Sequence, residues 1–239
     1  MGRHGTIAGR KAAQDSKRAA MFTKYARAIT VAAKAGGDPE YNATLRLAIE
    51  KAKAISMPND NITRAIKKGT GELAGETYEE LSFEGYGVGG VAVIVEALTD
   101  NTNRTTSSVR STFDKYGGNL GASGCVSWSF DRKGVIVIDN EDEELDEDTV
   151  MMDALDAGAA DFQPEEGCFT VYTDPDAIND VAKALEDKGY KFDSAQIEMV
   201  PQTYQKLEKQ EDRDNMEKML DLFEDDDDVQ NVWHNWDQE

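Results

Sequence analysis

Basic side chains are the residues whose types and spacing most clearly predict a chemistry in this sequence, namely the binding of phosphate groups. In a helix expected between residues 16 and 36, four of them fall within about 100° of arc opposite the apolar face: Lys17, Lys24, Arg27 and Lys34. No acidic residue interrupts residues 16–37. Cations arranged in this way bind phosphates with an affinity that falls steeply as the salt concentration rises. Such contacts contribute little to recognition of a particular base sequence.

Further cations extend this prediction beyond the first helix. Arg64, Lys67 and Lys68 repeat the arrangement on another expected helix, facing away from its apolar residues, and a basic arm precedes the first helix. The predicted nucleic-acid-binding set is Arg10, Lys11, Lys17, Arg18, Lys24, Arg27, Lys34, Arg64, Lys67 and Lys68. The alternative interpretation is that these are ordinary solvated helix faces. The aromatic rings of Phe22 and Tyr25 could stack on bases, although core packing is the preferred interpretation for Phe22.

The distribution of charge supports the first interpretation. The chain carries a formal net charge of -21, which by itself would repel a polyanion. Residues 1–75 nevertheless hold 14 Lys and Arg against 6 Asp and Glu, whereas residues 76–239 hold 12 against 41. The first segment is therefore at +8 and the remainder at -29. This asymmetry predicts a basic surface for nucleic acid, or for another acidic partner, attached to an acidic body.

Catalytic, metal and cofactor sites are not predicted. The two histidines, His4 and His234, lie at opposite ends of the chain, and no nucleophile elbow, P-loop or metal-spaced cluster is present in the sequence. The glycines of EGYGVGGVAV are followed by a strand and not a helix, so we interpret them as a hairpin turn. The acidic run from Asp225 to Asp228 is interpreted as a solvated turn that ends a helix. We expect a protein that is not an enzyme and needs no cofactor.

The elements that must position the basic residues form a small helical unit. Apolar residues recur at spacings of three and four in residues 16–36, 43–55 and 58–69, which predicts three short amphipathic helices packed as a bundle. At 239 residues the chain is long enough for two or three domains. No stretch approaches the roughly 20 apolar residues of a membrane span, and no secretory signal is apparent, so we expect a cytoplasmic protein without membrane contact.

After residue 75 the pattern changes to strands and helices, which predicts an α+β fold. Residues 134–201 read β-α-β-β-α-β, the ferredoxin-like order. In the segment CVSWSF, residues 125–130, large apolar residues alternate with smaller or polar ones, which predicts a half-buried strand. We predict a basic helical bundle (1–75), a discontinuous α/β domain (76–133 plus 202–239), and the ferredoxin-like domain (134–201) inserted into it.

Several long strings in this order resemble the YebC/PmpR family of bacterial proteins: RKAAQDSKRAAMFTKYARAITVAAKAGG, FEGYGVGGVAVIVEALTDNTNRT and FEDDDDVQNVWHN. The resemblance covers the chain from about Arg10 to its end. It implies three domains and a probable DNA-binding transcriptional regulator, with relatives that include a mitochondrial translational activator. Family members commonly begin with Gly-His-Ser-Lys-Trp, whereas this chain has Gly2, Arg3, His4, Gly5 and Thr6, so no contact is assigned there.

Two nucleic-acid targets remain open from the sequence. The first hypothesis is a transcriptional regulator that binds DNA, and the alternative is a ribosome-associated translation factor that binds ribosomal RNA. Another hypothesis is a protein-only adaptor that uses the ferredoxin-like domain and whose basic arm meets an acidic protein in place of phosphate. A protein partner of the acidic domains is a further expectation. Phosphate contacts alone do not distinguish DNA from RNA.

Overall fold

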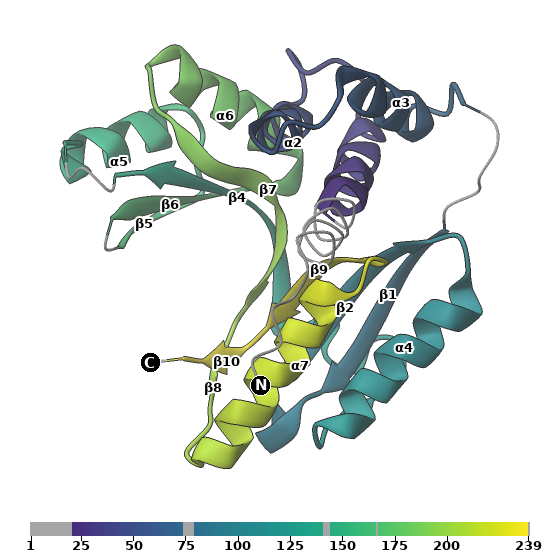
Figure 1. Ribbon diagram of the computed structural model, residues 1–239. Coiled ribbons are helices and arrows are strands. Elements are labelled where there is room, and N and C mark those ends of the chain that lie inside the picture. The colour runs from purple at the N-terminus through teal and green to yellow at the C-terminus, as the bar shows by residue number, and fades with distance from the viewer. Residues whose placement is uncertain (1–20, 74–78, 141–143, 166, 239) are drawn as a thin grey trace, which may run out of the picture.

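A computed structural model describes residues 21–73, 79–140, 144–165 and 167–238 (Figure 1). The N-terminal module consists of a helix whose described part spans residues 21–33, α2 (Ala43–Ala54) and α3 (Asn59–Gly69). The Asn42 side chain caps α2 by accepting a hydrogen bond from the backbone N–H of Leu45. The three helices share one apolar core, made of Ile29, Ala32, Ala33, Leu45, Ile49, Ala52, Met57, Ile62 and Ala65.

Close approach of the first and third helices depends on a glycine. A Cβ atom at Gly69 would lie 2.3 Å from the carbonyl oxygen of Thr30 and 2.6 Å from the Cβ of Ala33. The Thr30 hydroxyl donates to the carbonyl oxygen of Ala65, 3.2 Å away, and ties the same two helices together. The basic residues of α3 are thereby held beside those of the first helix.

The middle domain is a four-stranded antiparallel sheet in the order β3-β1-β2-β9. Its strands are β1 (Glu79–Tyr86), β2 (Ala92–Thr99), β3 (Asn119–Leu120) and β9 (Val229–His234). Helices α4 (Thr102–Lys115) and α7 (Gln210–Asp225) pack on one face, where the rings of Phe113 and Phe223 meet edge to face (Figure 1). The glycines between β1 and β2 form a hairpin turn around η1 (Val88–Gly90), as predicted.

The third domain is the sheet β5-β6-β4-β7 with two helices on one face. Its elements follow each other in the order β-α-β-β-α-β, and all neighbouring strands are antiparallel. They are β4 (Phe130–Asp139), α5 (Glu147–Asp156), β5 (Asp161–Glu165), β6 (Cys168–Thr173), α6 (Ile178–Asp187, preceded by η3 at Pro175–Ala177) and β7 (Phe192–Pro201). The α+β class and the ferredoxin-like order are confirmed. Strand β4 begins at Phe130, before the expected boundary at residue 134.

The chain returns from β7 to the middle domain through β8 (Gln205–Lys206), which pairs in parallel with β10 (Trp236–Asp237), the strand that follows β9. It then forms α7 and β9, and β9 pairs with β2. The middle domain is thus built from two separate stretches of chain, and the ferredoxin-like domain lies between them in the sequence. No helix in the described ranges has both the length and the apolar content that crossing a membrane requires.

The prediction of a strand at residues 125–130 was wrong. The segment forms a turn with a 3-10 helix, η2 (Ser127–Ser129), and the Trp128 side chain is 72% exposed. The carboxylate of Glu84 in β1 accepts hydrogen bonds from the backbone N–H groups of Gly124, Val126 and Ser127, at 2.8 to 2.9 Å. Because these N–H groups donate to a side chain and not to a neighbouring strand, the alternating residues do not form a strand.

The N-terminal module also packs against the ferredoxin-like domain. Ala43 of α2 is part of that domain's core, and its backbone N–H donates to the Asn179 side chain at 2.9 Å. The guanidinium of Arg46 forms an ion pair with Glu186 of α6. This contact between α2 and α6 leaves the first helix and α3 as the elements that present the predicted phosphate-binding residues.

Candidate nucleic-acid interface

Helix α3 presents its cations away from the module's core. Ile62 and Ala65 are buried, whereas the side chains of Arg64 and Lys67 are exposed and Lys68 is half-buried. Asp60 in the first turn and the two lysines in the last turn match the helix dipole. The residues of α3 are therefore placed as the sequence predicts, with two of the three open to solvent.

The basic face of the first helix has a different environment. It lies against the middle domain, as Figure 1 shows for the purple helix between α3 and the sheet that contains β2 and β9. The Lys24 ammonium donates to the backbone carbonyl oxygen of Glu224 at 3.0 Å, and Lys34 forms an ion pair with Glu80 of β1. The periodicity of the first helix predicts that its basic face is exposed to solvent. In the structure this face packs against the middle domain.

Arg27 is the most deeply placed of these cations. Its side chain is 14% exposed, and its Nη2 atom lies 3.1 Å from Oδ1 of Asp228. The Nε and Nη1 atoms of the same guanidinium are buried and have no hydrogen-bond partner among the described residues. Leaving a buried charged donor without an acceptor costs about 1–3 kcal/mol or more of folding free energy. Two hydrogen-bond donors of this guanidinium are therefore unsatisfied in the folded chain.

Asp228 is a buried acceptor for several donors, and its prediction as part of a solvated turn was wrong. Its side chain is 6% exposed, and Oδ2 accepts from the Thr105 hydroxyl at 2.7 Å and from Nη2 of Arg104 at 2.8 Å. Burial alone would raise the pKa of this carboxyl, but the hydrogen bonds from Arg104, Thr105 and Arg27 outweigh it and lower the pKa. Asp228 is therefore held as a carboxylate, and it fixes the position of Arg27.

A pocket of about 290 Å³ opens where these elements meet. It joins cations from two helices, Arg27 from the first and Arg64 and Lys68 from α3, with polar groups beside them and an apolar wall. Its remaining lining residues are Phe22, Thr23, Ala26, Thr30, Asn61, Ala65 and Leu98. Cations, hydroxyl and amide groups and an aromatic ring together can bind a phosphate-bearing ligand that also has a flat apolar part.

Of the predicted set, Arg27, Arg64 and Lys68 converge on this pocket, while Lys24, Lys34 and Lys67 do not line it. Arg10, Lys11, Lys17 and Arg18 lie outside the described residues. Phe22 and Tyr25 both pack against the module's core, and Phe22 also borders the pocket.

Sequence reasoning missed several lining residues of the pocket, among them Asn61 and Leu98. Asn61 stands three and seven positions before Arg64 and Lys68, so the helical spacing that links those cations also reaches Asn61. Leu98 comes from β2, and no local signal connects it to the helices. A search for polar residues in register with the cations would have found Asn61 but not Leu98.

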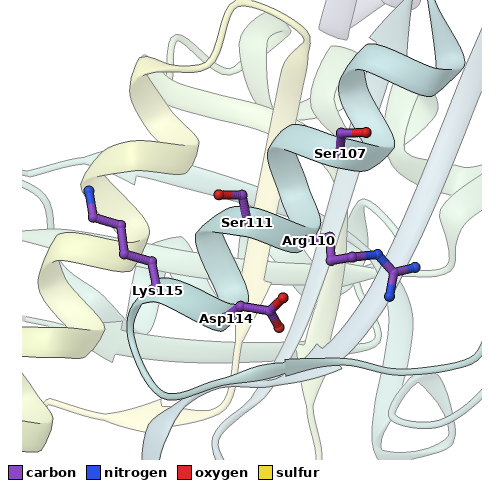
Figure 2. Close-up of a pocket in the computed structure, with 5 residues that line it drawn as sticks. All are labelled: Ser107, Arg110, Ser111, Asp114 and Lys115. Atoms are coloured by element: carbon purple, nitrogen blue, oxygen red, sulfur yellow. The ribbon is translucent and has the colours of Figure 1, made fainter.

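A second surface feature runs along α4. Figure 2 shows its five side chains on one side of the helix: Ser107, Arg110, Ser111, Asp114 and Lys115. All five are exposed, and they belong to a single helix with both signs of charge. Among the described residues no group of three or more His, Cys, Asp and Glu side chains is arranged to hold a metal ion. The pocket beside Arg27 is therefore the better candidate for ligand binding.

Comparison with known proteins finds similarity along nearly the whole chain. Residues 3–72 match a family model described as the TACO1/YebC protein N-terminal domain, and residues 78–236 match one described as the TACO1/YebC second and third domain. A probable transcriptional regulatory protein of Clostridioides difficile is 56% identical over 240 residues, covering 100% of both chains. Another, from Geobacter sulfurreducens, is 55% identical and covers 97% of this chain and 93% of the relative.

One solved structure supports the same relationship. The crystal structure of a conserved hypothetical protein from Aquifex aeolicus superposes with a TM-score of 0.80 at 46% sequence identity. The match covers 93% of this chain and 91% of that one. The similarity therefore extends over all three structural units.

Proposed function

Because this chain belongs to the TACO1/YebC family, we propose that it is a non-enzymatic regulatory protein whose helical N-terminal module binds the phosphate backbone of a nucleic acid. The observation that carries the proposal is the position of Arg64 and Lys68 of α3 on one pocket beside Arg27, in a module with a net charge of +8 on an acidic body. The names of the relatives favour transcription and hence DNA as the target.

Salt dependence of binding is the direct test of this proposal. Each phosphate contact contributes about 0.9 to the slope of log K against log salt concentration for duplex DNA. Replacing both Arg64 and Lys67 with Glu is expected to weaken binding to a labelled duplex and to reduce that slope by about 2. Fluorescence anisotropy between 50 and about 200 mM salt measures both quantities.

A matched control is available on α2. Lys51 and Lys53 are exposed on α2, outside the predicted nucleic-acid-binding set, so changing both to Glu alters the net charge by the same amount at another place. Equal losses in the two double variants would refute a localised interface and leave only a general charge effect. Binding without salt dependence would refute phosphate contacts altogether.

A ribosomal RNA target is the second candidate. Phosphate contacts carry no sequence information, so the same surface suits a structured RNA as well as an operator. Co-sedimentation of the chain with ribosomes, repeated with the Arg64→Glu, Lys67→Glu variant, distinguishes the two targets. Loss of ribosome binding together with unchanged binding to duplex DNA would identify RNA as the target of α3.

A further inference from the structure

The pocket beside Arg27 has two regions of different chemistry. Arg64 is exposed, and Arg64 and Lys68 stand on α3, where they can meet a phosphate group. Arg27 lies deeper and is already paired with the carboxylate of Asp228. A second anion at Arg27 would be repelled by that carboxylate, whereas a neutral acceptor would not. The deep end therefore suits a carbonyl oxygen or ring nitrogen, and the α3 side suits a phosphate.

The free donors of Arg27 are held in place before any ligand arrives. Asp228 is fixed by Arg104 and Thr105, and its backbone carbonyl accepts from the N–H of Leu98 at 2.8 Å. The guanidinium is thus oriented with its Nε and Nη1 atoms buried and lacking acceptors. Both atoms are shielded from solvent, so an acceptor reaches them only when a neighbouring side chain of the pocket moves aside, and it then satisfies donors that the folded chain leaves unsatisfied.

The dimensions and the wall of the pocket restrict the ligand further. Its volume of about 290 Å³ is at the lower end of small-ligand pockets, which span about 300–1,000 Å³. This space accommodates one nucleotide and not a base pair. Phe22 supplies an aromatic ring, the kind of group on which bases stack, and Leu98 adds an apolar side chain to the wall.

We propose that this pocket holds a single unpaired nucleotide of a bound strand, with its phosphate on Arg64 and Lys68, its base edge on Arg27 and its ring beside Phe22. A base inside a duplex has its pairing edge occupied and both faces stacked, so it must leave the helix to enter. The inference rests on the proposed function and adds a preference to it. The chain prefers nucleic acids that contain an unpaired nucleotide over continuous duplexes.

The test compares three fluorescent probes of related sequence with the full chain: a continuous duplex, the same duplex with a one-nucleotide bulge, and the single strand. Each is made as DNA and as RNA. We expect the bulged probe to bind about tenfold more tightly than the continuous duplex in at least one of the two series, an increment typical of one stacked base. Equal affinities for bulged and continuous probes in both series would overturn the proposed pocket.

Variants of the chain test whether the preference for a bulged probe arises in this pocket. Asn61→Trp fills the pocket from a half-buried position and keeps every cation, and Thr63→Trp places the same side chain at an exposed position of α3 that does not line it. We expect the ratio of bulged-probe to duplex affinity to fall to about one in the first variant and to be retained in the second. Phe22→Leu, which retains apolar packing, is expected to reduce the preference severalfold.

These outcomes separate the site from the function on which it rests. A preference that persists in a folded Asn61→Trp protein, as judged by circular dichroism, overturns the pocket, and so does a preference that Phe22→Leu leaves intact. Equal binding to all probes refutes the pocket alone, because phosphate binding is still observed. Absence of binding to every probe refutes the proposed function and the pocket with it.

Discussion

Replacement of Asp228 with Asn is expected to destabilise the protein by about 3 kcal/mol at neutral pH. The carboxylate is 6% exposed and interacts with Arg27 of the N-terminal module and with Arg104 of α4. Removing one partner of a buried ion pair typically costs 3–5 kcal/mol because the other charge stays buried. We take about 3 kcal/mol, the lower end, because Arg104 is 52% exposed and keeps Asp100 as a partner.

The measurement is equilibrium unfolding in urea and thermal unfolding, both followed by circular dichroism. For a chain of this length about 3 kcal/mol corresponds to a decrease in Tm of roughly 6–12 °C. Asp227→Asn is the matched control, since this neighbour is exposed and loses the same charge. We expect the control to stay within about 0.5 kcal/mol of the unchanged protein.

A double variant and a pH series complete the test. Because the pKa of Asp228 is lowered, its contribution to stability is present above its ordinary value of 3.8 and is lost as the pH falls through the folded value. The difference between the unchanged protein and Asp228→Asn should therefore shrink below about pH 4. Arg27→Met combined with Asp228→Asn should cost less than the sum of the single changes, by about 1–3 kcal/mol. A loss below about 1 kcal/mol, or an equal loss in the control, would refute the buried role of this carboxylate.

Two further predictions concern other half-buried or buried carboxylates. Burial opposes ionisation of Glu84, but hydrogen bonds from three backbone N–H groups lower its pKa, so Glu84→Gln should cost about 2–3 kcal/mol at pH 7 in urea unfolding and less below pH 4. Exposed Glu79→Gln serves as its control, and equal losses would contradict the role of the turn. Burial raises the pKa of Glu198, so Glu198→Gln should raise the Tm at pH 7 by a few degrees, with the gain vanishing as the pH falls through the raised value toward 4.5. A decrease in Tm at pH 7 would contradict this assignment.

Local periodicity was sufficient for much of the fold. The spacing of apolar residues predicted α3 from about residue 58 to Gly69, and the helix spans Asn59–Gly69. The same pattern gave the order of the ferredoxin-like domain and indicated that the strand at Val229–His234 joins the middle sheet. Each of these elements buries one face, and the spacing of apolar residues along the sequence indicates which face is buried.

The errors arose where a residue distant in the sequence determines the environment. Residues 125–130 alternate as a strand does, but the carboxylate of Glu84, some 40 positions earlier, takes their backbone donors. Asp228 stands in a run of acids that reads as solvated, yet Arg27 and Arg104 reach it from two other elements. A helical projection of the first helix shows one apolar face and does not show what covers the other.

Acidic residues of the body influence the phosphate site in two opposite ways, and the geometry indicates which one dominates. Glu80, Glu186 and Asp228 each pair with a cation of the module, so these acids fix its position and do not repel a strand. The acidic run that precedes Asp228 lies beside the first helix, since the Lys24 ammonium donates to the backbone carbonyl oxygen of Glu224. Acids farther than about 8–10 Å from the cations are largely screened at physiological salt. Figure 1 shows α5, which carries exposed Glu147 and Asp148, at the opposite side of the molecule from α3. The affinity for nucleic acid should therefore depend on the cations of α3 and the adjoining pocket and on the acids next to them more than on the net charge of -21.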